Sequence, residues 1–177
     1  TILITTNYFA TEKSIRKLLA MNQISIKKMI EKCVKRLEKN DKFYYLGKCY
    51  DIIISANQKE ILIDEDKIYV GNIKKLNEWL RSNTIILFNN RLENMYSLMD
   101  EKIEYPQLKI RKMKSRWGVC NRVKNTITLN IDLIRYNLDV IDYVIIHELC
   151  HFIQFNHSRD FWNLVEKYCP NYKIIRS

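Results

Sequence analysis

The stretch of sequence that decides the fold is YVIIHELCH at residues 143–151, followed by NHS at residues 156–158. It reads His-Glu-x-x-His, with a third histidine six residues after the second, and the chain has no other histidine. Because residues four apart share one face of a helix, His147 and His151 can bind one metal ion together, and a turn can return His157 as a third ligand. Glu148 lies one step round the helix, within reach of a water on that ion. The pattern therefore predicts a catalytic zinc site.

A solvated helix face that carries these polar residues by chance is the alternative to a metal site. The flanking residues are apolar, with Val144, Ile145 and Ile146 directly before the motif and Phe152 and Ile153 directly after it. Unpaired imidazoles and a carboxylate in so apolar a helix would be costly. A bound metal is the simplest compensation, so the flanks favour the metal site.

The composition is that of a globular protein with one sizeable core. Of the 177 residues, 47% are hydrophobic and 28% are charged. No apolar run reaches the length of about 18 residues that spans a membrane. The five cysteines are odd in number and form no C-x-x-C pair, which favours free thiols in a reducing compartment. No signal peptide is visible, although the chain begins at Thr1 rather than at a methionine. We expect a cytoplasmic protein with no membrane partner.

Basic residues gather in one segment of the chain. The formal net charge is +10, and residues 105–131 contain no acidic residue. A basic surface beside a catalytic site favours an anionic partner such as nucleic acid, nucleotide or acidic polypeptide. A general enrichment in lysine along the whole chain is the alternative explanation. The candidate contacts are Lys109, Arg111, Lys112, Lys114, Arg122 and Lys124.

Hydrophobic periodicity divides the chain into three segments. Residues 1–41 are expected to be an N-terminal helical segment, with a strand at residues 2–6, a helix at 11–21 and a basic-faced helix that Ser25 caps. Residues 42–104 are typical of an antiparallel β-meander followed by a long helix from residue 73 to about 100. Residues 105–177 are expected to be the catalytic core, and residues 42–177 to form one folded unit.

The catalytic segment is expected to surround the metal helix with a small sheet and two further helices. Strands at residues 108–113 and 126–130 would form a hairpin, and residues 131–136 a short helix. Asn137 or Asp139 can cap the metal helix.

The end of the chain carries its own start and stop signals. Ser158 is a good cap for a final helix, and Pro170 stops that helix. Residues 171–177 are expected to be a tail. Capping by Ser158 would also fix where the neighbouring His157 points.

Further motifs flank the metal stretch. They are YLGKxY at residues 45–50, SRWGxC at 115–120, IxLN at 127–130, NHSxxFW at 156–162 and PxY at 170–172. Together with the metal stretch they resemble the YgjP-like metallopeptidase family, over about residues 43–172. That family is similar to the SprT and WLM proteases, some of which act on protein attached to DNA.

The resemblance implies an α+β, zincin-like fold, in which an antiparallel or mixed sheet packs on the HExxH helix and its edge strand borders the cleft. It implies Zn2+ on His147, His151 and His157, with Glu148 as the general base. The sequence departs from the family at Val119, where a small polar residue is usual, and this puts in doubt any polar substrate contact there. A second departure is Asn137, where proline is frequent.

The predicted chemistry is peptide hydrolysis by water on zinc. Glu148 would take a proton from that water and pass it to the leaving amine. Arg116, Tyr136 and Tyr143 are the candidates for stabilising the oxyanion. Each has an ordinary structural alternative, an ion pair for the arginine and a core position for the tyrosines.

Three other side chains near the motifs are expected to be structural. Trp117 would pack the hairpin onto the metal helix, with substrate stacking as its alternative role. Trp162 would pack the last helix onto the core. Cys150 falls well round the helix from His151, which indicates a core position rather than a fourth ligand.

Three functions compete at this stage. The first is a zinc-dependent peptidase acting on polypeptide, including nucleic-acid-associated protein, and an edge strand at residues 115–120 would suit it. The second is a metal-dependent nucleoside triphosphate pyrophosphohydrolase, which normally needs paired carboxylates for magnesium that residues 105–151 lack. The third is a nucleic-acid-binding module with structural zinc, although such a site needs no base like Glu148 and usually has four protein ligands.

Overall fold

The computed structural model describes residues 11–25, 28 and 42–176, and the chain divides into two compact units, Thr1–Lys42 and Phe43–Ser177. In the first unit, α1 (Glu12–Met21) agrees with the expected helix. Ser25, expected to precede the next helix as its cap, is itself helical. The expected strand at residues 2–6 and nearly all of the helix after Ser25 lie outside the described residues.

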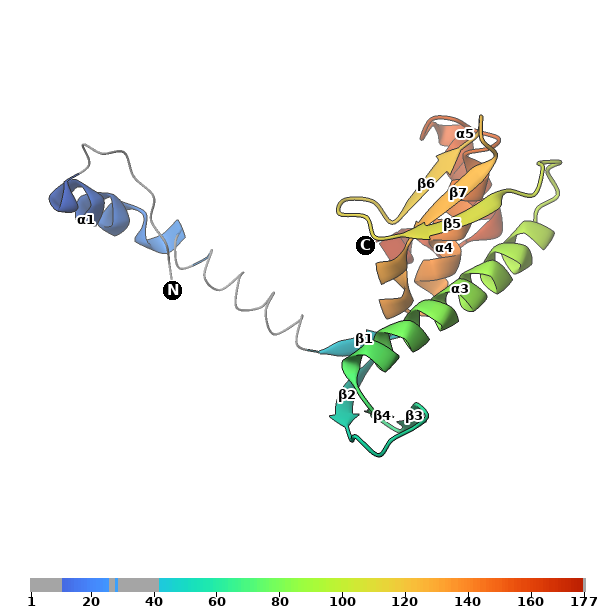
Figure 1. The fold of residues 1–177 in the computed structure, drawn as a ribbon. Helices are drawn as coiled ribbons and strands as arrows, with labels where there is room; N and C mark the ends of the chain where they lie inside the picture. Colours follow the sequence, from blue (N-terminus) through green and yellow to red (C-terminus); the bar gives the residue numbers. More distant parts are fainter. Residues whose placement is uncertain (1–10, 26–27, 29–41, 177) are drawn as a thin grey trace. The chain divides into compact units, whose positions relative to one another are not determined.

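The second unit begins with a four-stranded sheet in the order β1-β2-β4-β3 (Figure 1). Its strands are β1 (Phe43–Tyr45), β2 (Lys48–Ile54), β3 (Leu62–Asp64) and β4 (Lys67–Val70). The outer pairs are antiparallel, but β2 and β4 are parallel, so the expected antiparallel meander is wrong at its centre. The reason is burial. β4 carries the fully buried Ile68 and Val70 and therefore lies inside the sheet, whereas every residue of β3 is exposed and this strand lies at the edge.

The long helix α3 (Ile73–Ser97) connects this sheet to the rest of the unit (Figure 1). Asn72 caps it by accepting a hydrogen bond from the Lys75 N–H at 2.9 Å. Arg91 of α3 forms an ion pair with Asp142 in the metal helix. Spacings of three and four, with one of eight, link its buried residues: Leu76, Thr84, Phe88, Leu92 and Met95.

A three-stranded sheet follows, in the order β5-β7-β6. Its strands are β5 (Gln107–Arg111), β6 (Gly118–Asn121) and β7 (Thr126–Asn130). β6 and β7 form an antiparallel hairpin, whereas β5 lies parallel to β7, so the expected hairpin of residues 108–113 with 126–130 is wrong. The tight turn at residues 122–125 can join only β6 to β7, and β5 reaches β7 through a longer crossover. β6 is therefore an edge strand.

One buried side chain holds this crossover in place. Asn130 is 4% exposed. Its amide oxygen accepts from the backbone N–H groups of Met113 and Asp132, and its amide nitrogen donates to the carbonyls of Met113 and Arg116. The side chain thus fixes the loop that leads into β6.

The helices that complete the unit are η1 (Ile131–Arg135), α4 (Leu138–Cys150), α5 (Arg159–Tyr168) and α6 (Tyr172–Arg176). Asn137 caps α4 and Ser158 caps α5, as predicted, while the expected tail at residues 171–177 contains α6. The sheet covers α4 (Figure 1), and the fully buried contact residues include Ile127, Leu129, Ile141, Ile145 and Leu149. The mixed sheet on the HExxH helix confirms the α+β class. Within the described residues, no helix combines the length and apolarity of a membrane span.

Candidate metal centre

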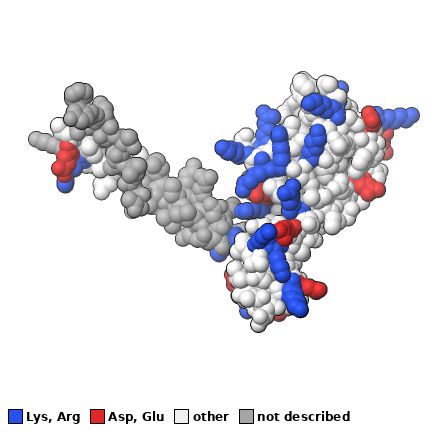
Figure 2. Space-filling model, in the orientation of Figure 1, with Lys and Arg blue, Asp and Glu red and all other residues white. Residues whose placement is uncertain are grey.

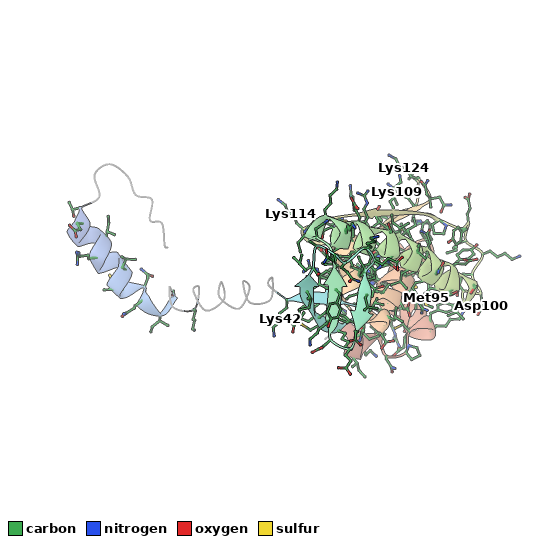
Figure 3. The ribbon with its side chains drawn as sticks, turned by 60° about the horizontal axis from the view of Figure 1, so that its bottom comes forward. Lys42, Met95, Asp100, Lys109, Lys114 and Lys124 are labelled. Atoms are coloured by element: carbon green, nitrogen blue, oxygen red, sulfur yellow. The ribbon has the colours of Figure 1, made fainter. Side chains whose placement is uncertain are left out.

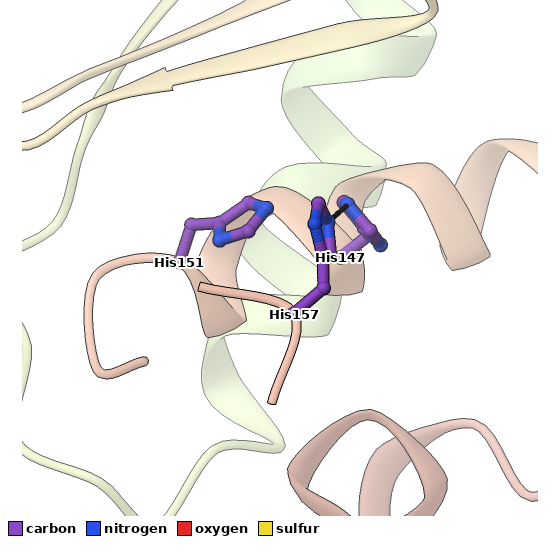
Figure 4. Close-up of side chains that lie close together, drawn as sticks. All are labelled: His147, His151 and His157. Atoms are coloured by element: carbon purple, nitrogen blue, oxygen red, sulfur yellow. Dashed lines mark hydrogen bonds between the residues drawn. The ribbon is translucent and has the colours of Figure 1, made fainter. Parts of the chain in front are cut away.

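Helix α4 presents two imidazoles one turn apart. The rings of His147 and His151 have centroids 4.8 Å apart, and His157 reaches toward them from the loop after the helix (Figure 4). The Nε2 atoms of His147 and His157 are 3.1 Å apart. One ligand atom from each of the three histidines lies within 4.8 Å of the others. The three side chains therefore surround a single point.

The loop histidine is oriented mainly by aromatic contacts. His157 is exposed and precedes the cap of α5, where Ser158 accepts a hydrogen bond from the Phe161 N–H at 3.3 Å. Its ring stacks on Trp162, with centroids 5.6 Å apart and planes at 21°, and meets Phe161 edge-on at 4.8 Å. Trp162 stacks in turn on Tyr172 of α6. The short helix α6 thus supports Trp162, and through it the predicted third ligand His157.

The ring nitrogens fit a metal of the zinc type. His151 Nδ1 lies 3.1 Å from the carbonyl of Gln154, and a donated hydrogen bond there leaves Nε2 free as a ligand. Burial, and then the charges of the other two histidines, lowers the pKa of His147 to about 3, so its ring is neutral. Its buried Nδ1 has no hydrogen-bond partner among the described residues. Neutral imidazole nitrogens converging at such spacings suit zinc, whose tetrahedral ligand atoms lie about 3.4 Å apart.

Glu148 is buried beside the histidines and faces the edge strand. Its side chain is 6% exposed, and burial raises the pKa of its carboxyl to about 7 against the lowering effects of a backbone hydrogen bond from Cys120 and the charge of Arg116. A Cβ on Gly118 would lie 2.5 Å from Oε1 of Glu148. The carboxylate therefore occupies space that exists because residue 118 is glycine.

Gly118 is a residue of the candidate site that the sequence analysis does not single out. In the sequence it is only one letter of the SRWGxC motif. A usable signal was present, because a glycine within a strand often marks the close approach of another group, and the chain has only three glycines.

A cleft of about 660 Å³ opens at the histidines. Its lining residues are Arg116, Gly118, Val119, Cys120, Asn121, Arg122, Val123, His147, Glu148, His151, Phe155 and His157. Of the three oxyanion candidates, only Arg116 lines it. Tyr136 packs against Trp117, and Tyr143 lies behind the site with its ring centroid 5.9 Å from that of His147, where burial raises its pKa.

The residues expected to be structural behave differently from one another. Trp117 is 43% exposed and lies edge-on to Tyr136 at the end of η1, rather than packing into the core with the metal helix. Trp162 packs on the core as expected and also supports His157. Cys150 is fully buried in the core. Cys120 is half-buried in the cleft, where burial raises the pKa of its thiol to about 12, and it does not belong to the ligand cluster found among the described residues.

The basic residues lie mostly outside the cleft, on the outer face of the three-stranded sheet. Lys109 and Arg111 are exposed on β5 and alternate with the inward Leu108 and Ile110. Figure 2 shows Lys and Arg side chains gathered over this sheet, and Figure 3 shows Lys109, Lys114 and Lys124 along one side of it. Arg122 alone of the six candidate contacts also lines the cleft.

The fold and the site define a class: a metallopeptidase domain in which a His-Glu-x-x-His helix and a later histidine face a cleft below a sheet edge. The model of a protein family, "YgjP-like, metallopeptidase domain", matches residues 1–177, and the chain belongs to this YgjP-like family. The predicted family resemblance is therefore confirmed.

Two solved structures are also similar to part of the chain. One is the metallopeptidase zymogen of Pyrococcus abyssi abylysin, with 27% identity, covering 50% of this chain and 87% of that one at a TM-score of 0.46. The other is the metallopeptidase zymogen of Methanocaldococcus jannaschii jannalysin, with 22% identity, 51% and 90% coverage and a TM-score of 0.39. No curated protein matches the chain.

Proposed function

We propose that this chain is a zinc-dependent peptidase that uses Glu148 as its general base. The observation that carries the proposal is the position of the Glu148 carboxylate, which is buried against the edge strand β6 and lines the same cleft as the three histidines. Zinc held by His147, His151 and His157 would supply a Lewis acid and lower the pKa of water bound to it to about 7.

The residues of the chain have distinct parts in this reaction. Glu148 accepts a proton from the attacking water and delivers it to the nitrogen of the leaving amine. In the metal-free protein burial raises the pKa of this carboxyl to about 7, so the site favours a proton on Glu148 more than water does. Arg116 lines the cleft beside Glu148 and is our candidate for binding the carbonyl oxygen as negative charge develops on it.

The substrate would lie along β6. This strand pairs with β7 on one side only, so its other edge can add an extended segment of polypeptide through backbone hydrogen bonds. The pyrophosphohydrolase alternative is less well supported, because Glu148 is the single carboxylate among the described residues that line the cleft. Asp132 and Asp142 are occupied by arginine or lysine partners elsewhere. A structural zinc is also less well supported, since the histidine cluster found among the described residues has three protein ligands and faces an open cleft.

The test compares the zinc-loaded chain with Glu148→Gln by mass spectrometry. Each is incubated with an unfolded polypeptide and, separately, with the four ribonucleoside triphosphates. We expect peptide fragments from the wild type, none from the variant, and equal zinc content in both. Glu104→Gln, an exposed carboxylate outside the cleft, should cleave like the wild type. Equal cleavage by Glu148→Gln would exclude the mechanism, and Glu148-dependent release of nucleoside monophosphate would favour the pyrophosphohydrolase.

We further propose that the outer face of the three-stranded sheet brings nucleic-acid-associated protein to this site. A concavity of about 490 Å³ beside the segment that follows β5 is lined by Arg111, Lys112, Lys114 and Arg116, and no acidic residue is among its described lining residues. Lys112 lies 3.8 Å from Asp132, and no salt bridge is found for the other three within the described part of the chain. Free cations so grouped suit a phosphate backbone.

Binding of a labelled oligonucleotide, followed by anisotropy at increasing salt, tests this second proposal. We expect the affinity to fall steeply with salt, and the double variant Lys109→Glu/Arg111→Glu to bind more weakly with a shallower salt slope. Arg81→Glu, on the exposed side of α3, is the matched control. Affinity that the sheet variant leaves unchanged would exclude this surface.

A further inference from the structure

Two large apolar side chains stand exposed at the rim of the cleft. Val123 is 97% exposed at the turn between β6 and β7, and Phe155 is 78% exposed in the loop between His151 and His157. Isolated exposed apolar residues are ordinary on a protein surface. These two belong to separate elements and yet line the same cleft as the histidines. Neither contributes to a core, so their shared position points to a ligand.

The same cleft carries two cationic side chains. Arg116 precedes β6 and Arg122 follows it, so that one guanidinium lies near each end of the edge strand. Both side chains are exposed, and neither has a salt bridge among the residues that the structure describes. Within the part of the chain that the structure describes, Glu148 is the one carboxylate that lines the cleft. Apart from the catalytic carboxylate, the lining therefore offers apolar surface and positive charge.

We infer that the cleft selects extended polypeptide segments in which a bulky apolar residue lies beside the scissile bond and acidic residues lie near it. This inference rests on the proposed peptidase function and names its substrate class. Phe155 and Val123 contact the apolar side chain, which removes three exposed apolar surfaces from water at once. Arg122, next to Val123 in the chain, pairs with an acidic side chain of the substrate, while the positive charge of Arg116, which is proposed to bind the carbonyl oxygen, adds to the preference for acidic segments.

The arrangement also disfavours other segments. Lysine or arginine near the scissile bond would face Arg116 and Arg122, and like charges in a cleft repel. A segment without a bulky apolar residue would leave Phe155 in water. Because such apolar residues are normally buried in native proteins, the cleft would act on unfolded or misfolded chains in preference to folded ones.

A nucleotide is the competing occupant, with its base on Phe155 and its phosphates on the arginines. The free edge of β6 favours polypeptide, because a nucleotide cannot pair with the backbone of a strand. The lone carboxylate in the lining also leaves no pair of acids to hold magnesium on phosphates.

A synthetic peptide library, with every residue type at each position, tests the inference on the zinc-loaded full chain. Cleavage sites are read by mass spectrometry. We expect phenylalanine, leucine, isoleucine and methionine to be enriched beside the cut, aspartate and glutamate to be enriched nearby, and lysine and arginine to be depleted. Phe155→Ser should reduce kcat/KM for the best apolar peptide by about 10-fold and flatten the apolar preference. Arg122→Gln should flatten the acidic preference and leave the apolar one.

Matched controls come from α3, away from the cleft. Ile86→Ser removes an apolar side chain that is 61% exposed, and Arg81→Gln removes an exposed cation. Both should leave the preferences unchanged.

The outcomes separate this inference from the function beneath it. Glu148-dependent cleavage with no apolar preference, or with a preference that Phe155→Ser leaves intact, would overturn the inference while the peptidase stands. If no peptide is cleaved, the proposed peptidase function itself is wrong. Glu148-dependent hydrolysis of nucleoside triphosphates, weakened by Phe155→Ser, would assign the rim to a base instead.

Discussion

The two parts of the metal centre are held by different means. His147 lies within α4 and His151 caps its C-terminal end, and the inner face of this helix is buried in the core. His157 lies in a loop and owes its orientation to a helix cap and to the ring of Trp162. A helix fixes the spacing of two ligands through its own geometry, whereas the loop ligand depends on side chains that the helix does not control. The loop should therefore be the weaker and more easily tuned part.

The largest expected effect is the loss of zinc affinity when a histidine is removed from the helix or from the loop. His151→Ala should weaken zinc binding by more than about 100-fold, since each ligand contributes roughly a third of a free energy on the order of 10 kcal/mol. His157→Ala should weaken it less, because ordering a loop ligand already costs conformational entropy that a helix ligand does not. Competition with a chromogenic chelator measures both constants. Equal losses of zinc affinity would show that helix and loop ligands are held equally well, and a greater loss for His157→Ala would show that the loop ligand is the stronger one.

The helix also contains a destabilising group, the buried Glu148 carboxylate, whose effect on the free energy of unfolding can be measured when the metal is removed. Because burial raises the Glu148 pKa to about 7, the folded protein holds a proton that the unfolded chain releases from about pH 4.5 upward. The free energy of unfolding therefore falls as pH rises from about 4.5 to about 7. Glu148→Gln does not lose stability in this way. Without metal, its free energy of unfolding should exceed that of the wild type by about 3 kcal/mol at pH 8 and equal it near pH 4.

Urea unfolding after chelation, at several pH values, checks this result. The depressed pKa of His147 acts in the opposite sense, lowering stability as pH falls below about 6.5, but it is common to both proteins and cancels in the difference. Glu104→Gln serves as the control for loss of an exposed charge. A pH-independent difference between Glu148→Gln and the wild type would mean that the carboxyl is not buried in solution.

A smaller effect is expected from the support behind the loop. Trp162→Leu removes the ring on which His157 stacks and should weaken zinc binding by about 10-fold, within the range found for outer partners of metal ligands. Trp162→Phe keeps an aromatic face and should recover most of the affinity. Thermal unfolding without metal separates this positioning role from packing. If leucine and phenylalanine weaken binding equally, stacking is not what orients His157.

The smallest effect is expected at the cap. Ser158→Ala leaves the Phe161 N–H without its acceptor and should lower the free energy of unfolding by about 1 kcal/mol, with a few-fold loss of zinc affinity. Ser158→Asp, another good cap, should restore both. Asn137→Ala removes the corresponding cap of α4, and we expect it to lower stability without changing zinc affinity at a given temperature. Loss of affinity in Asn137→Ala would show that helix and loop are equally sensitive.

The sequence predicted the features that depend on local spacing. The metal helix, the caps Asn137 and Ser158, and the long helix α3 all follow from residues within a turn or two of one another. Strand pairing was predicted only in part. In the first sheet β2 pairs with β4 instead of β3, and in the second sheet β5 and β7 pair as expected but run parallel instead of forming a hairpin. The parallel partners β2 with β4 and β5 with β7 bring together segments separated by another strand.

The site shows the same division. The convergence of His147, His151 and His157 could be expected from a helix and a turn. The closeness of Gly118 to Glu148 and the stack of His157, Trp162 and Tyr172 could not, since each depends on how separate elements pack. Of the three oxyanion candidates, Arg116 lines the cleft and Tyr136 and Tyr143 do not. The position of Arg116 depends on the loop before β6, whose backbone Asn130 binds.

The absent side chain of Gly118 makes this site vulnerable to a change that adds atoms and removes none. An alanine there would leave every ligand, cap and core residue in place, yet its methyl group would occupy the room of the Glu148 carboxylate. Folding assays and metal titrations would then show normal stability and normal metal binding in a protein without catalytic activity. A single methyl group at this position would thus separate the integrity of the scaffold from the activity it supports.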